Sequence, residues 1–179
     1  MKKLILKILL LLVVIAFIYF RFNNQTVITS YPDITMQLKS SAFENNAKLP
    51  ERYTCDGAKV NPPLTFEGIP SEAKSLTLIF DDPDAPSGDF VHWLLWNIKP
   101  ETYNIGEHSV PPGAIQGLNG YSRYAYGEPC PPGGSHHYTF TLYALDAMLS
   151  IPNSSTKADL LVAMEHHILA RAKLVGIYR

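Results

Sequence analysis

The sequence has little cysteine: Cys55 and Cys130 are the only two among its 179 residues. They are not spaced like zinc ligands, which come in close pairs. The sequence also lacks internal repeats, coiled-coil heptads and a glycine-rich phosphate loop, and its histidines His166 and His167 are adjacent rather than four apart. A zinc-protease helix needs two histidines four residues apart with a glutamate between them. These absences exclude repeat proteins, coiled coils, phosphate-loop nucleotide binders and that class of zinc protease.

Basic residues are scarce beyond the N-terminus. Residues 1–22 contain four Lys and Arg and no acid, whereas the rest of the chain has 11 basic and 16 acidic residues, a net charge of −5. Affinity for nucleic acid depends on neutralising phosphates with Lys and Arg, so an acidic domain is a poor nucleic-acid binder. We therefore expect no nucleic-acid partner, and nothing in the sequence calls for a metal or another cofactor.

The N-terminus contains a long apolar run, Leu4–Phe20, interrupted only by Lys7 and preceded by two lysines. Such a run is typical of a secretory signal or a membrane anchor. The aromatic residues that end it disfavour cleavage, and its length is near the short limit of about 20 residues for a spanning helix. We predict that residues 1–22 form a hydrophobic helix that anchors the chain, with the domain on the outer side. A cleaved signal, which would leave a secreted or periplasmic protein, is the alternative.

The remainder reads as a short linker over residues 23–33 and a mainly β domain over residues 34–179. Fourteen prolines argue against a helical bundle. One helix is predicted to begin near Thr156 and to hold both His166 and His167. Its apolar stripe comprises Leu160, Leu161, Met164, Ile168, Leu169 and Ala172. Strands are predicted at residues 34–38, where apolar and polar residues alternate, at the apolar runs 75–80 and 91–98, and at residues 139–145 and 173–178.

Two rigid loops lie at ends of these strands. The segment 82–86, Asp-Pro-Asp-Ala-Pro, follows the apolar run at 75–80, and the segment 127–135 opens into the strand that begins near His136. Proline fixes its own φ and restricts the residue before it, so such loops have little conformational entropy left to lose. Two rigid loops of this kind, if they meet in space, could build a small pocket with convergent polar groups.

At these residues the chain resembles the phosphatidylethanolamine-binding proteins, in the bacterial and archaeal branch called Raf kinase inhibitor-like. The resemblance runs from about Leu38 to the C-terminus. It implies an antiparallel β-sandwich with a few peripheral helices, and a small pocket for an anionic or phosphorylated ligand such as phosphate or a phospholipid headgroup. The segments that carry it are 53–57, 61–64, 82–86, 92–93, Asn97, Gly117, 126–127, 129–132, 136–138 and 174–178.

The resemblance also implies which side chains bind the ligand. A histidine can become charged near neutral pH and donate to a phosphate oxygen, and a tyrosine can donate as well. Trp93 alternates to the other face of its strand and is expected in the core. Glu128 stands where the family usually has glycine, and would disfavour phosphate if it pointed into the pocket. The implied ligand-binding residues are Asp82, Pro86, His92, Pro131, Pro132, His136 and Tyr138.

Two alternatives stay open at the level of sequence. In an exported chain the two cysteines suggest a disulfide between Cys55 and Cys130, but two buried free thiols fit equally well. The pocket could also serve a hydrolase. Two histidines and one carboxylate form a known open metal site. Ser87 and Ser135 lie close to histidines, although neither sits in a nucleophile elbow and no complete triad is visible. We expect a binding protein without catalytic residues, whose protein partner would be a kinase or, for an outward-facing domain, a protease.

Overall fold

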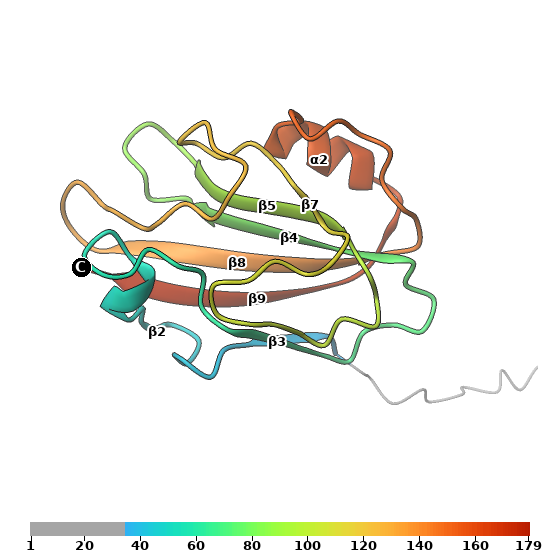
Figure 1. Cartoon of the computed structure of the whole chain (residues 1–179), viewed down its shortest axis with the longest axis horizontal. Coiled ribbons are helices and arrows are strands. Elements are labelled where there is room, and N and C mark those ends of the chain that lie inside the picture. Colours follow the sequence, from blue (N-terminus) through green and yellow to red (C-terminus); the bar gives the residue numbers. More distant parts are fainter. Residues whose placement is uncertain (1–34) are drawn as a thin grey trace, which may run out of the picture. The chain divides into compact units, whose positions relative to one another are not determined.

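The computed structural model describes residues 35–179, so the predicted hydrophobic helix and linker lie outside the described residues. Figure 1 shows a mainly β architecture, which confirms the expected mainly β class. The few peripheral helices that were expected amount, among residues 35–179, to one α-helix and one short 3-10 helix. The elements are β1 (Gln37–Lys39), β2 (Ala47–Lys48), the 3-10 helix η1 (Glu51–Tyr53), β3 (Leu64–Glu67), β4 (Ser75–Asp82), β5 (Phe90–Ile98), β6 (Asn104–Ile105), β7 (Ile115–Gln116), β8 (His136–Leu145), α2 (Lys157–Met164) and β9 (Ile168–Tyr178).

The strands form two sheets. A six-stranded sheet has the order β2-β9-β8-β4-β5-β7, and a three-stranded sheet has the order β1-β3-β6. The pairings are antiparallel with one exception, because β2 runs parallel to β9. The sheets are thus antiparallel, as expected, apart from this one short edge pairing. The central strands β9, β8, β4 and β5 are the long ones, whereas both edge strands of the large sheet have two residues, which limits pairing with other chains.

The core lies on both faces of the large sheet, and β4 is buried along its whole length. On one face Phe80 and Phe140 pack with residues of the small sheet, such as Phe66. On the other face Leu94 and Trp96 pack with the buried side of α2. A strand covered on both faces needs a continuous apolar sequence, which β4 and β5 have. Trp93 is buried, as expected.

The predicted helix is much shorter than its apolar stripe suggested. Thr156 is its N-cap and forms a capping box with Asp159, and the helix ends at Met164. From Ile168 onward the chain is β9, which pairs with β8 as far as His136↔Tyr178. The prediction of a helix through Ala172 was wrong. A short apolar run is compatible with both the helical period of 3.6 residues and the strand period of two, and here pairing with β8 made it a strand.

The two adjacent histidines are consequently not helical. His166 and His167 lie in the turn between α2 and β9, where His167 Nδ1 is 2.7 Å from Asp146 Oδ1. Both side chains are exposed. The expectation that they lie on the helix was wrong.

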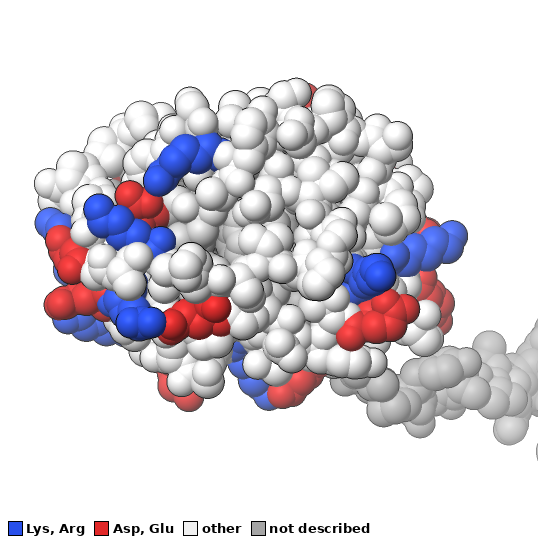
Figure 2. All heavy atoms as spheres, in the orientation of Figure 1, with Lys and Arg blue, Asp and Glu red and all other residues white. Residues whose placement is uncertain are grey.

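Within residues 35–179 no helix has the length and apolar character that crossing a membrane requires. Figure 2 shows that charged side chains gather toward the two ends of the face in view, with acidic and basic groups side by side. The middle of this face is largely free of charge.

Candidate functional site

A cavity of about 220 Å³ lies where the ends of β4, β5 and β8 meet. Its wall contains all seven residues predicted to bind the ligand; that they bind one stays a prediction. A larger hollow of about 520 Å³ lies beside β1 and β9, but its wall has no histidine and its one carboxylate, Glu44, is exposed. The small cavity is lined by Asp82, Ala85, Pro86, Ser87, Phe90, His92, Tyr121, Cys130, Pro131, Pro132, His136 and Tyr138.

Asp82 and His136 form a buried pair in this wall. β4 ends at Asp82 and β8 begins at His136, and the two strands are antiparallel neighbours, so their ends meet. His136 Nδ1 donates to Asp82 Oδ2 at 2.7 Å, and the side chains are 7% and 5% exposed. The backbone N–H of Asp84 donates to Asp82 Oδ1 at 2.9 Å. Both carboxylate oxygens thus have a donor, which offsets the cost of burying the charge. We call Asp82 and His136 the inner pair.

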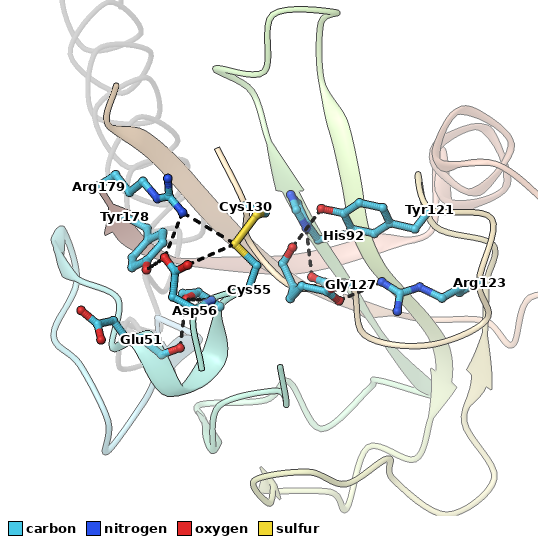
Figure 3. The surroundings of a disulfide bond; sticks show 12 residues. Glu51, Cys55, Asp56, His92, Tyr121, Arg123, Gly127, Cys130, Tyr178 and Arg179 are labelled. Carbon is cyan, nitrogen blue, oxygen red and sulfur yellow. Dashed lines mark hydrogen bonds and ion pairs between the residues drawn. A yellow bond between two sulfur atoms is a disulfide. The ribbon is translucent and has the colours of Figure 1, made fainter. Parts of the chain in front are cut away.

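His92 is held by Gly127 through two reciprocal hydrogen bonds (Figure 3). Its ring Nδ1 donates to the Gly127 carbonyl oxygen at 2.9 Å, and the Gly127 N–H donates to the His92 carbonyl oxygen at 2.8 Å. A Cβ at residue 127 would lie 2.8 Å from the Tyr121 ring and 2.9 Å from the His92 carbonyl oxygen, so only glycine fits. Burial lowers the pKa of His92 to about 4, because the charged ring would lose its hydration. The ring is therefore neutral at pH 7, with its proton on Nδ1.

Tyr138 supplies an unpaired donor to the same cavity. It is two residues after His136 on β8 and therefore faces the same side of the sheet. The side chain is fully buried, and its hydroxyl has no hydrogen-bond partner among the described residues. Burial raises the pKa of this hydroxyl, which keeps its proton. Buried polar groups nearly always have partners, so an orphan hydroxyl in a cavity wall indicates a place for a ligand.

Phe90 and Tyr121 also line the cavity, although neither was among the residues predicted to do so. Phe90 precedes His92 by two residues on β5, so the period of a strand could have found it. Tyr121 comes from a loop that Asn119 organises: Asn119 Oδ1 accepts from the Tyr121 N–H at 2.9 Å, and its amide donates to the Ala125 carbonyl oxygen at 2.8 Å. No local pattern marks Tyr121, because only this loop's fold brings it to the cavity.

Glu128 does not line the cavity. Its Oε2 accepts from Arg123 Nη2 at 2.8 Å, and the Arg123 guanidinium lies over the Tyr121 ring, 4.9 Å from its centroid. The carboxylate that stands where the family usually has glycine is thus paired with an arginine outside the cavity wall.

Cys55 and Cys130 form a disulfide, with their Cα atoms 5.3 Å apart. Cys130 belongs to the cavity wall, so the bond ties this wall to the turn after η1 (Figure 3). The next residue of that turn, Asp56, accepts from the Tyr178 hydroxyl and from Arg179 Nη2. The alternative of two free thiols does not hold.

The geometry bears on the hydrolase alternative as well. Among residues 35–179 no three His, Cys, Asp or Glu side chains lie close enough to hold a metal ion. Ser87 is in the cavity wall and Ser135 is not. In the described part neither serine forms a hydrogen bond with a histidine. The inner pair does orient one ring nitrogen of His136 away from a buried carboxylate, as a general base would require.

Comparison with known proteins places the chain in a family. Residues 39–179 match the sequence profile described as phosphatidylethanolamine-binding protein. A UPF0098 protein of Methanothermobacter thermautotrophicus is 48% identical over 149 residues, which cover 80% of this chain and 99% of that protein. A crystal structure of a phosphatidylethanolamine-binding protein homologue from Chlamydia trachomatis is 43% identical, with a TM-score of 0.78 over 81% of this chain and 97% of that one. Escherichia coli YbcL, described as a member of the mammalian PEBP family, is 26% identical, with a TM-score of 0.76 over 80% and 98% of the two chains. The chain therefore belongs to the phosphatidylethanolamine-binding protein family.

Proposed function

We propose that this protein binds a small anionic or phosphorylated group, such as phosphate or a phospholipid headgroup, in the cavity at the ends of β4, β5 and β8. The observation that carries the proposal is the Tyr138 hydroxyl, which is buried in the cavity wall without a partner. An unsatisfied buried polar group costs about 1–3 kcal/mol, a cost that a bound oxyanion would remove by accepting its hydrogen bond.

The rest of the cavity wall suits a rigid binding site. Pro86, Pro131 and Pro132 fix the backbone of the two loops, and the disulfide at Cys130 holds one of them. A preformed site loses little entropy when it binds, so even a small ligand can gain useful affinity. The name of the family points in the same direction, since phosphatidylethanolamine carries a phosphate in its headgroup.

The test removes one oxygen atom. Phosphate and phosphoethanolamine are titrated into the purified full-length chain by calorimetry, with the wild type compared with Tyr138→Phe. Loss of one hydrogen bond to a charged group predicts at least a roughly tenfold loss of affinity. The matched control is Tyr103→Phe, because Tyr103 is 64% exposed and lies outside the cavity wall. Unchanged affinity in Tyr138→Phe, or no binding of either compound to the wild type, would contradict the proposal.

A second candidate function, hydrolysis in the same cavity, is favoured by the inner pair. A histidine oriented by a buried carboxylate is the arrangement of a general base, and Ser87 would be the nucleophile it activates. Turnover of a chromogenic ester that disappears in both Ser87→Ala and His136→Ala would support hydrolysis. Turnover that survives Ser87→Ala would exclude this serine.

We further propose that residues 1–22 tether the domain to the outer side of a membrane, where its protein partner would be a protease rather than a cytoplasmic kinase. The support is the apolar run Leu4–Phe20 and the lysines before it. Digestion of intact cells by an added protease would remove an outward-facing domain. Protection of the domain until the cells are lysed would contradict this location.

A further inference from the structure

We propose that the free edge of β9, over residues 168–174, binds an extended acidic segment of a partner protein, which adds to the large sheet as a further strand. The hollow beside this edge shares no residue with the wall of the cavity at the ends of β4, β5 and β8. The inference is therefore independent of the proposed function.

The edge is free because β2 covers only one end of β9. β2 has two residues and pairs with β9 near the C-terminal end of that strand (Figure 1). Val175 is covered as well, since its carbonyl oxygen accepts from the Asn46 N–H at 2.8 Å and its N–H donates to Asn45 Oδ1 at 2.9 Å. Residues 168–174 have no strand on this side within the described part of the chain. We call them the β9 edge.

The β9 edge presents unpaired backbone groups. In an antiparallel pair the backbone groups of alternate residues point toward the partner strand, and those of the residues between them point away. Val175 points away from β8, so Arg171 and Lys173, which alternate with it along the strand, do so as well. Among residues 35–179 the N–H and C=O groups of these two residues have no hydrogen-bond partner. Such a row of groups is a template for one more strand.

A hollow of about 520 Å³ lies along this edge, between β9 and β1. β1 is itself the edge strand of the small sheet, so the sandwich is open here. The wall contains apolar side chains from both sheets and from the loop after β1, namely Met36, Leu38, Phe43 and Leu174. A strand added to the β9 edge would turn every second side chain toward this hollow. Apolar residues fit at those positions.

The opposite face of the β9 edge is basic. Arg171 and Lys173 point away from the face on which Leu174 joins the core. Both are exposed, and neither forms an ion pair within the described residues. Asp81, which lies on the same face, accepts from Lys157 instead. The remaining side chains of an added strand would lie beside these two cations, where acidic residues form favourable cross-strand pairs.

A partner's acidic segment fits this edge better than a second copy of the chain does. Pairing two β9 edges would bring Arg171 and Lys173 of both copies close together, and like charges on neighbouring strands repel. In the wall of the hollow, Lys39 is already bound to Glu67, and Glu44 is the one acidic residue. The segment that the edge favours therefore alternates acidic and apolar residues.

The first experiment measures the binding of model peptides to the purified full-length chain by fluorescence anisotropy. One short peptide alternates glutamate and valine, and a second has lysine in place of glutamate. We expect saturable binding of the acidic peptide and at least roughly tenfold weaker binding of the basic one, which would place cations beside Arg171 and Lys173. Equal affinities, or no binding of the acidic peptide, would overturn the inference and leave the proposed function standing.

The second experiment separates strand addition from simple attraction of charges. The acidic peptide is N-methylated at every glutamate in one version and at every valine in another, which keeps the charge and removes alternate donors. Because only one of these two sets of N–H groups can face the sheet, we expect one version to bind like the parent and the other at least about tenfold more weakly. Equal effects of the two modifications would show that no strand is added.

A charge-reversing variant locates the peptide on the chain. Arg171→Glu/Lys173→Glu should bind the acidic peptide at least about tenfold more weakly than the wild type. The matched control is Lys74→Glu/Lys99→Glu, at two exposed lysines that lie outside the wall of the hollow. Unchanged affinity in Arg171→Glu/Lys173→Glu would contradict the location. If this variant fails to fold by circular dichroism, the methylated peptides and the wild type decide the inference.

Sedimentation of the wild type with and without the acidic peptide tests the competing occupant. We expect the peptide to bind without changing the oligomeric state of the chain. A dimer that the peptide dissociates would show that a second copy occupies the β9 edge, and would overturn the inference.

Discussion

Two Asp–His pairs lie side by side at this end of the sheet and have different surroundings. The inner pair is Asp82–His136, and the pair Asp84–His137, which we call the outer pair, has the same Nδ1 to Oδ2 distance of 2.7 Å. The inner side chains are 5% and 7% exposed, whereas the outer ones are 42% and 52% exposed. Adjacent residues on a strand point to opposite faces, so His136 enters the cavity and His137 faces solvent.

The two pairs have the same hydrogen-bond distance, so their different contributions to stability must come from their burial and not from the contact itself. An exposed ion pair contributes about 0–1 kcal/mol, because water screens it and the side chains lose entropy. Breaking a buried pair costs several times more, because the remaining partner stays in a poorly hydrated site. The outer pair does have a local effect: the hydrogen bonds from His137 lower the pKa of Asp84. Only the inner pair, however, can shape a ligand site.

Removing the Asp82 carboxylate of the inner pair should have the largest effect on stability. Asp82→Ala leaves His136 Nδ1 and the Asp84 N–H without their acceptor. We expect the free energy of unfolding to fall by about 3–5 kcal/mol, as for other buried pairs that lose one partner. Urea denaturation at pH 7 measures this value. A loss below about 1 kcal/mol would show that the inner pair behaves like an exposed one.

The disulfide supports the surroundings of the inner pair, because Cys130 lines the same cavity as Asp82 and His136. In Cys55→Ser/Cys130→Ser the cross-link between residues 75 positions apart is lost. We expect a loss of about 2–4 kcal/mol in the free energy of unfolding, together with weaker phosphate binding. Denaturation and calorimetry on the oxidised wild type and the double variant measure both. Unchanged phosphate affinity would mean that the cavity wall keeps its shape without the bond.

His92 is a buried histidine whose partner is a carbonyl oxygen, whereas the partner of His136 is a carboxylate. Its pKa is about 4 in the folded state against an ordinary value of 6.5. On acidification the unfolded chain takes up this proton first, so stability present at pH 7 is lost as the pH falls from 6.5 to 4. The loss is on the order of 3 kcal/mol.

The measurement follows the urea midpoint from pH 7 to pH 4 in the wild type, His92→Gln and His166→Gln. The wild type and His166→Gln should lose the stability that the neutral His92 ring contributes at pH 7, and His92→Gln should not. Parallel curves for all three proteins would contradict a buried neutral His92.

The outer pair should give the smallest effect. Asp84→Ala removes a carboxylate that is 42% exposed, and we expect a change below about 1 kcal/mol in the free energy of unfolding at pH 7. Because His137 lowers the pKa of Asp84, whatever stability the pair contributes is present above the ordinary pKa of an aspartate and lost below it. The same denaturation assay compares this variant with Asp82→Ala. Equal losses in the two variants would remove the distinction between the pairs.

Sequence reasoning succeeded where the signal is local or comes from several motifs in order. The apolar runs that became β4, β5 and β8 were found because a strand covered on both faces needs a continuous apolar sequence. The seven residues implied by the resemblance also line one cavity. They belong to motifs that lie at the ends of these strands, and the strand ends meet in the sheet. The short strands β6 and β7 had no comparable signal.

The sequence by itself determined the mainly β class and the rigid proline loops at the strand ends, with Asp and His side chains beside them. Only the tertiary structure decided that Ile168–Tyr178 is a strand, that Tyr121 closes the cavity and that Glu128 is paired with Arg123. It also decided which ring nitrogen of His92 carries the proton. These outcomes depend on partners far away in sequence, such as β8 for β9 and Gly127 for His92, and local propensity holds no information about such partners.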